Sequence, residues 1–406
     1  MNIKQAILDR FLSYVKVETT SDDNSQTVPS TPTQYAFAKT LEQEMKNIGV
    51  ENVILTDKGY LMGIVPSNIE EHVPAIGFIA HMDTYHEFNG KDVTPIVHKN
   101  YDGKKIPLKN KVTIDPASDK QLLQCIGDTI ITTDGTTVLG GDDKSGIAII
   151  MTLAEYLIKN PGIKHGKICI GFTPDEEIGR GSDHFDVKAF GADFAYTVDG
   201  DAFDSVENGN FNGDGFTIKI TGVSCHPGSA KDVMVNPVRV AADIISSWPT
   251  SKLPETTDGT DGFIFFTTIK GSIESAEVHG AVREHSIDKL HMLEDTLRQI
   301  VEDKKKFYKN ANIELTIKDQ YRNMKDVILE HPQAMEKLAD ALKELGFKYT
   351  VRQVRGGTDG ARLSFMGLPT PNIFAGYSQP HGPYEWASLE YMEKAFKVIK
   401  TIAEVK

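Results

Sequence analysis

Three consecutive acidic residues, Asp175, Glu176 and Glu177, follow a short apolar segment and Pro174. The segment, residues 167–172, is largely apolar and predicts a buried strand. Acidic clusters on a surface helix are usually a solvated face. At the carboxyl end of a buried strand, however, acids lie at the edge where open α/β sheets bind their ligands. Carboxylates this close repel one another, which favours a bound cation, and a metal ion is the natural candidate.

Four further apolar segments also run into a histidine or an acidic residue. The pairs are 74–80 with His81, 137–139 with Asp142, 194–198 with Asp199, and 371–376 with His381. Each has a bland explanation on its own. A histidine is more often a core or surface residue, an aspartate before the apolar helix 147–158 can be a cap, and Asp-Gly is a common turn.

Taken together, these strand ends predict a metal site. An α/β sheet brings the carboxyl ends of its strands to one edge, so we expect the five side chains to lie side by side. Two imidazoles and three carboxylates suit zinc or a similar divalent ion. The predicted set is His81, Asp142, Glu177, Asp199 and His381. Asp83, two residues after His81, is placed to orient that imidazole and fix its tautomer.

Composition narrows the class of protein. A chain of 406 residues with 40% apolar and 25% charged residues predicts an ordinary two-domain protein. The formal charge of −13 argues against nucleic acid or an anionic membrane as a partner. The N-terminus has an amphipathic helix pattern, and the longest apolar segment is too short to span a bilayer. Three cysteines without paired spacing imply no disulfide framework and fit a reducing cytoplasm.

The pattern changes between Asn208 and Asp319. An Asn/Gly-rich stretch, residues 208–215, predicts a hinge. It is followed by a strand, a helix, two strands, a helix and a strand, at residues 216–223, 236–248, 263–270, 277–283, 288–309 and 312–317. This is the order of a ferredoxin-like unit. We therefore predict an α/β fold in which residues 1–208 and 319–406 form one domain with a mostly parallel sheet, and residues 209–318 form an inserted α+β domain.

Seven motifs, in order along essentially the whole chain, resemble those of the M20 metallopeptidase family, and most of all its aminotripeptidases. They are HMDT, GGDDKSG, FTPDEEIG, TVDG, SCHPGSAKDVMVNP, RGGTDG and HGPYEW. The resemblance implies a metallopeptidase catalytic domain with two metal ions per subunit, usually zinc. It also implies that the inserted domain is a lid that can form a homodimer.

The resemblance also implies a role for each matched residue. His81 and Asp199 would hold one ion, Glu177 and His381 the other, and Asp142 would bridge them, while Asp83 orients His81. Glu176 would be the general base. His226, in the inserted domain, would reach the scissile carbonyl, in many family members from the partner subunit.

The expected substrate is a small peptide with both ends free. Asp175 and the other acids would favour a cationic amine, and Arg355 or Arg283 would favour a carboxylate at the far end. A structural ion pair is about as plausible for Arg283 and less so for Arg355. A site that anchors both ends measures peptide length, which together with the resemblance favours removal of the N-terminal residue from tripeptides.

Other functions remain open at this stage. Within the family the chain could be a dipeptidase or an N-acyl-amino-acid deacylase, because motif spacing does not report peptide length. A glycosidase that uses Glu176 with a second acid leaves His81 and His381 unexplained. A non-catalytic metal-binding protein leaves Glu176 without a role.

Overall fold

The computed structural model describes all 406 residues and divides into two compact units. Unit 1 comprises Met1–Asn208, Asp326–Arg352 and Thr358–Lys406, and unit 2 comprises Gly209–Lys325 and Gln353–Gly357. The sequence placed the end of the inserted domain at residue 318, whereas the last strand of unit 2 runs on to Tyr321. None of the helices has the length and apolar character needed to cross a membrane.

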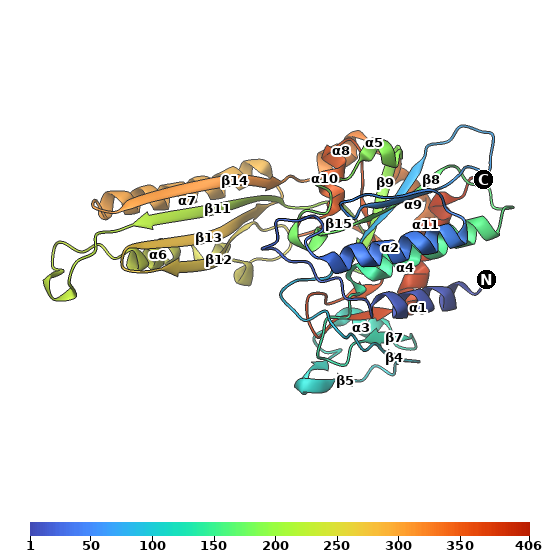
Figure 1. Cartoon of the computed structure of the whole chain (residues 1–406), viewed down its shortest axis with the longest axis horizontal. Helices are drawn as coiled ribbons and strands as arrows, with labels where there is room; N and C mark the ends of the chain where they lie inside the picture. Colours follow the sequence, from blue (N-terminus) through green and yellow to red (C-terminus); the bar gives the residue numbers. More distant parts are fainter. The chain divides into compact units, whose positions relative to one another are not determined.

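Unit 1 is built on a mixed eight-stranded sheet (Figure 1). In spatial order its strands are β1 (Glu51–Leu55), β2 (Leu61–Val65), β8 (Ile168–Thr173), β3 (Ile76–His81), β9 (Phe194–Gly200), β16 (Asn372–Phe374), β10 (Ser205–Gly209) and β15 (Thr350–Gln353). The four central strands, β8, β3, β9 and β16, run parallel. β1, β2 and β10 pair antiparallel at the flanks. The predicted α/β fold is confirmed, with the parallel part at the centre of the sheet.

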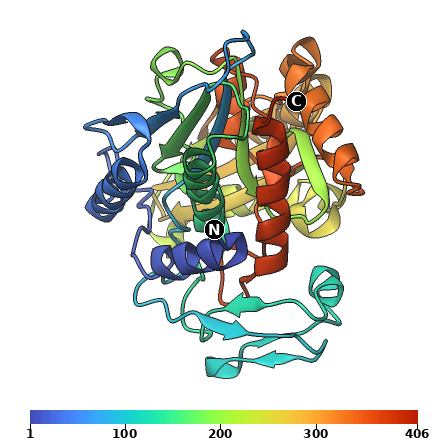
Figure 2. The ribbon, with the colours of Figure 1, turned by 90° about the vertical axis from the view of Figure 1, so that its right-hand side faces the viewer.

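Helices cover both faces of this sheet, as the alternating side chains of its apolar strands require. On β3, Phe78 packs with the first helix layer, whereas Ile79 packs with the second. The first layer contains α1 (Ile3–Tyr14), α2 (Pro32–Ile48), α4 (Gly141–Lys159), α9 (Gln333–Glu344) and α11 (Leu389–Ala403), and the second contains α5 (Val187–Phe190) and α10 (Asp359–Phe365). Figure 2 shows α1, α4 and α11 as neighbours. The carboxyl ends of the parallel strands therefore meet at one edge.

Two small sheets lie beside the main sheet in unit 1. One contains β17 (Tyr377–Ser378), β18 (Trp386–Ser388), β7 (Ile130–Thr132) and β4 (Ile96–His98), and the other β5 (Ile106–Pro107) and β6 (Thr113–Ile114). A five-residue helix, α3 (Lys120–Gln124), lies between β6 and β7. The prediction of a strand at residues 137–139 is wrong, because this segment pairs with no strand.

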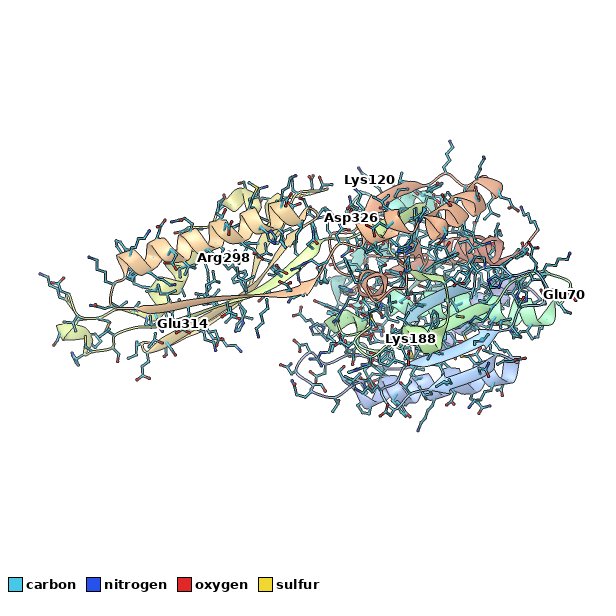
Figure 3. All side chains as sticks on the ribbon, turned by 90° about the horizontal axis from the view of Figure 1, so that it is seen from above. Glu70, Lys120, Lys188, Arg298, Glu314 and Asp326 are labelled. Atoms are coloured by element: carbon cyan, nitrogen blue, oxygen red, sulfur yellow. The ribbon has the colours of Figure 1, made fainter.

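Unit 2 has the predicted ferredoxin-like order of elements. They are β11 (Asn212–Thr221), α6 (Pro237–Ser246), β12 (Phe263–Gly271), β13 (Ser275–Glu284), α7 (Ile287–Phe307) and β14 (Asn312–Tyr321). The antiparallel sheet has the order β12-β13-β11-β14, and α6 and α7 share one apolar core with it. Figure 3 shows α7, which carries Arg298, lying along β14, which carries Glu314. α8 (Lys325–Glu330) follows as the chain returns to unit 1.

The stretch 208–215, where the sequence predicts a hinge, contains the boundary between the two units, and most of it is strand. β10 ends at Gly209 and β11 begins at Asn212. The asparagine side chains bond neighbouring backbone groups: Asn212 Nδ2 donates to the carbonyl of Glu284, and Asn210 Oδ1 accepts from the N–H of Met324. Side-chain amides thus join the crossing chains and stabilise strands that composition alone assigns to a flexible turn.

Candidate metal and catalytic centre

His81, Asp142 and Asp199 form the first of two ligand groups. His81 ends β3, Asp199 lies in β9, and Asp142 is the second residue of α4. His81 Nε2 lies 2.8 Å from Asp142 Oδ1 and 3.5 Å from Asp199 Oδ1. One ligand atom from each residue lies within 4.8 Å of the other two. Ligands held about 2.0–2.2 Å from a tetrahedral zinc ion are about 3–4 Å apart, so the group has the dimensions for one divalent ion.

Glu177 and His381 form the second group with the other oxygen of Asp142. Glu177 lies in the 3-10 helix η2 (Glu176–Ile178) directly beyond β8, and His381 lies between β17 and β18. His381 Nε2 is 3.0 Å from Glu177 Oε2 and 3.2 Å from Asp142 Oδ2. Asp142 thus presents Oδ1 to the first group and Oδ2 to the second. A carboxylate that bridges two ions needs this arrangement.

An unpartnered buried atom tests whether these residues fit a cation. Glu177 Oε1 is buried and has no hydrogen-bond partner, although buried polar atoms nearly always have one. Its group provides two carboxylates and one imidazole, a donor set typical of zinc sites. The residues therefore fit a divalent cation.

The electrostatics of the acids lead to the same conclusion. Burial and the charge of Asp142 raise the pKa of Glu177 to about 8 and the pKa of Asp199 to about 7. Burial also raises the pKa of Glu176 well above its usual range, with Asp359 adding to the shift. Buried acids this close together repel one another, and a divalent cation supplies the positive charge that offsets this repulsion.

Asp83 connects both groups and is fully buried. His81 Nδ1 lies 3.1 Å from the Asp83 carbonyl oxygen and 3.3 Å from Asp83 Oδ1, so Asp83 can accept a hydrogen bond from Nδ1 and leave Nε2 to bind a cation. The two Asp83 carboxylate oxygens also accept from the backbone N–H groups of Glu176, at 3.0 Å, and Glu177, at 3.1 Å. One side chain therefore orients a ligand and also holds the turn that carries Glu176.

Several residues that support the ligands were not found from the sequence. Tyr377 donates through Oη to the carbonyl oxygen and Oδ1 of Asp199, at 2.7 and 3.1 Å. Asn372 Oδ1 accepts from the Asp199 N–H at 3.1 Å, and Asn372 Nδ2 donates to Glu207. Asn372 lies within the predicted strand 371–376 and Tyr377 directly follows it, which was the only signal in the sequence.

Tyr85 contacts a ligand from the other side. Its ring stacks on His381 with a centroid separation of 4.2 Å and an interplanar angle of 3°. Tyr85 Oη donates to Glu87. The tyrosine follows the HMDT motif directly, but its contact is with a residue almost 300 positions later, which sequence spacing does not show.

Asp175 does not contribute to the site, which corrects the expectation that it attracts the substrate amine. Its backbone has a left-handed φ of 59°, and the buried carboxylate accepts hydrogen bonds from Ser30 and Gln34. Its oxygens are therefore satisfied by Ser30 and Gln34, and the carboxylate holds the start of α2.

Three predicted residues lie in unit 2. His226 is exposed and precedes the turn Pro227–Ser229, where it accepts from the N–H of Gly228. Arg355 donates through both terminal nitrogens to Thr257, Gly259 and Asp261, so the structure favours the structural role for it. Arg283 donates through one terminal nitrogen to two carbonyls of its own sheet.

The family model for peptidase family M20/M25/M40 matches residues 139–405 of this sequence. The chain belongs to that family. Among curated relatives, this M20 peptidase is 46% identical to "Peptidase T" of Clostridium perfringens over 397 residues, which cover 98% of each chain.

Solved structures share the fold of this M20 peptidase. A tripeptidase from Staphylococcus aureus superposes with a TM-score of 0.78 at 22% identity, covering 98% of this chain and 97% of that one. A protein from Bacillus subtilis described as a dinuclear metal-binding peptidase of the M20 family superposes with a TM-score of 0.65 at 16% identity, covering 99% and 97%. Both include the inserted unit within the matched length.

Proposed function

We propose that the protein is an aminopeptidase that releases the N-terminal residue from tripeptides, using two divalent metal ions. The observation that carries this proposal is the pair of ligand groups that share Asp142, directly beside an acid, Glu176, that belongs to neither group. Near-full-length identity of 46% to a protein named Peptidase T supports the peptide substrate.

The ions are proposed to be zinc. His81 and Asp199 would hold one ion, Glu177 and His381 the other, with Asp142 between them. Bound divalent ions would lower the pKa of a water molecule from about 15.7 toward about 7 and polarise the scissile carbonyl. The nitrogen and carboxylate donors, without any cysteine, also allow other divalent metals such as manganese or cobalt.

Glu176 is proposed to be the general base. It would take the proton of the attacking water and pass it to the leaving amine, the two steps of general acid–base catalysis. Burial raises the pKa of Glu176, which makes the carboxylate a better proton acceptor. The hydrogen bond from its N–H to Asp83 fixes the turn, so that the base and the ligand Glu177 keep their spacing.

Unit 2 is proposed to supply substrate contacts. His226 would donate to the developing oxyanion, and its exposure in the lid leaves the ring accessible. Of the two arginines, Arg283 is the better candidate for the substrate carboxylate. Arg355 has both terminal nitrogens bonded to carbonyl or hydroxyl oxygens of its own unit, whereas Arg283 uses only one. A guanidinium edge binds a carboxylate with two parallel hydrogen bonds.

Two copies are proposed to pair through unit 2. β12 is an edge strand and exposes Phe265 and Ile269, which are 47% and 48% accessible. Apolar side chains on a sheet edge favour association with another chain. Light scattering should give the mass of a dimer, and a monomer at micromolar concentration would contradict the proposed dimer.

The three free cysteines favour a cytoplasmic location.

The decisive experiment compares Ala-Ala-Ala with its N-acetyl form and with Ala-Ala, with zinc added. We expect rapid release of the first alanine only from the free tripeptide. Equal cleavage of the acetylated peptide would assign the protein as a deacylase or carboxypeptidase. Faster cleavage of Ala-Ala would assign it as a dipeptidase. A protein without metal by elemental analysis would exclude the proposed chemistry.

A further inference from the structure

The loop that leads to Asp142 belongs to no strand, and Asp142 itself, at the start of α4, has a non-helical backbone, yet it must face both ligand groups. Residues 137–140 have an extended or irregular backbone, and Gly140 has a left-handed φ of 77°. Strand pairing fixes His81 and Asp199 in place, but it does not reach this loop. Another group must therefore hold the loop.

Glu385 is that group. Its side chain is 1% exposed. Oε2 accepts from the N–H groups of Leu139, at 2.7 Å, and Gly140, at 3.0 Å, and Oε1 accepts from the N–H of Asp142, at 3.1 Å. A carboxylate that receives three backbone hydrogen bonds in a buried site is held rigidly, and these bonds are stronger than neutral ones.

Gly141 lets the carboxylate approach the loop. A Cβ at this position would lie 3.1 Å from Glu385 Oε1 and 2.9 Å from the Cβ of Tyr377, which is closer than side chains pack. The contact between Glu385 and the loop thus depends on the glycine within the GGDDKSG motif. The two motifs that contain Asp142 and His381 meet at this point.

Glu385 is itself fixed relative to His381. Its N–H donates to the carbonyl of Gly382, which closes a turn directly after His381. The next residue, Trp386, begins β18 and pairs with Thr132 of β7. The turn and the small sheet therefore set where the Glu385 carboxylate lies, and the carboxylate sets where Asp142 lies.

We propose that Glu385 is the positioning residue for the bridging ligand, because it fixes the Asp142 loop against the segment that carries His381. The inference rests on the proposed two-metal site. Since Asp142 contributes to both ligand groups, loss of the Glu385 contacts weakens both metal ions together. A residue that supports only one ligand group would weaken one ion.

The test is Glu385→Gln, measured by zinc titration against a competing chelator on folded protein. The amide keeps one acceptor oxygen. Its NH₂ group then faces either the N–H of Asp142, which loses one contact, or the N–H groups of Leu139 and Gly140, which loses two. We expect both zinc dissociation constants to rise about 10–100-fold, as found when groups that orient metal ligands are changed. Asp142→Ala gives the reference for complete loss.

Asp119→Asn is the matched control. Asp119 is also a buried carboxylate, accepts from two backbone N–H groups and from Trp386 Nε1, and does not contact the Asp142 loop. We expect it to lower resistance to urea while leaving both zinc constants unchanged. This separates a positioning role from a general loss of stability in the same part of the fold.

Unchanged zinc constants in folded Glu385→Gln would overturn the inference. If that variant does not fold, Glu385→Asp replaces it, since it keeps the charge but is one methylene too short to reach all three N–H groups. Wild-type affinity in Glu385→Asp would overturn the inference equally. A wild-type protein that binds fewer than two zinc ions would instead refute the proposed metal site, independently of Glu385.

Discussion

The two units use charged side chains in opposite ways. In unit 1, acids and histidines converge from separate strand ends, the pKa of Glu177 rises to about 8, and one of its buried oxygens has no hydrogen-bond partner. In unit 2, Arg355 is bonded to oxygens of its own unit and lies over the rings of Phe211 and Phe263. The first arrangement is incomplete without a cation, whereas the second is complete.

The difference shows how the partners of a charged side chain indicate whether it stabilises the fold or binds a ligand. A charge whose partners are all within the fold contributes to stability, because removing it leaves those partners unsatisfied. Charges of one sign that are buried together indicate a missing partner of the other sign. Asp175 and Glu176 illustrate this within two adjacent residues, since only Asp175 has its donors, Ser30 and Gln34, within the protein.

The largest expected effect is that of Glu176→Gln. Turnover of Ala-Ala-Ala should fall about 10²–10⁴-fold, the usual contribution of a general base, while zinc content stays at the wild-type value. The matched control is Asp175→Asn, which removes the neighbouring charge and should lower stability but not turnover. Steady-state kinetics and elemental analysis measure both. A tenth of wild-type turnover in Glu176→Gln would remove the base assignment.

His226→Ala comes next. Loss of a donor to an oxyanion lowers kcat about 10²–10³-fold in comparable enzymes, and no ligand of the metal site is touched. The zinc constants should therefore not change. His279, a histidine in strand β13 of unit 2 that is hydrogen-bonded to Thr217, gives a control variant, His279→Ala. Equal turnover of wild type and His226→Ala would show that the ring is not at the carbonyl.

The convergence of the five candidate ligands could be predicted because their residue types recur at the ends of apolar segments. β3, β8 and β9 are parallel neighbours, so topology brings these ends together. The inserted unit could be predicted because its strands and helices have strong, regular apolar patterns, as on α7 with Leu290 and Leu297. Residues at the ends of parallel strands can therefore be predicted from the sequence to lie close together.

Contacts between distant loops could not be predicted. Glu385 was within a recognised motif, but its three partners are backbone N–H groups about 245 positions earlier, which no residue type reports. The direction of Asp175 depends on a left-handed φ that an L-residue rarely adopts. The Asn/Gly-rich stretch 208–215 forms strands because Asn210 and Asn212 find partners across the chain.

Arg283 and Arg355 test whether stability and substrate binding are carried by different residues of one unit. Arg283→Ala should raise KM for Ala-Ala-Ala about 10–100-fold, the loss of a charged hydrogen bond worth about 1.5–3 kcal/mol. KM for the amidated tripeptide should not change. Arg355→Ala should lower the free energy of unfolding by about 1–3 kcal/mol and leave KM unaltered. The reverse pattern would assign substrate binding to Arg355, as its RGGTDG motif first suggested.

The smallest effect is expected at Tyr85, and it tests whether one ligand group can be changed alone. His381 is the most exposed of the five candidate ligands, with 42% of its side chain accessible, and the parallel ring of Tyr85 stacks on it. Stacked aromatic pairs contribute about 0.5–1.5 kcal/mol, so Tyr85→Ala should weaken one zinc ion roughly 2- to 10-fold. The other ion, held by His81 and Asp199, should keep its affinity.

Tyr85→Phe is the control, because it keeps the ring and removes only the hydrogen bond to Glu87. It should bind both ions as wild type does. The same chelator titration that tests Glu385 resolves the two zinc dissociation constants, so the Glu385 and Tyr85 variants can be compared directly. Glu385 acts on the ligand that both ions share, so its loss affects both, whereas Tyr85 touches only His381. Equal weakening of both ions in Tyr85→Ala would mean that the ring supports the site as a whole, and that the two ligand groups are not independent.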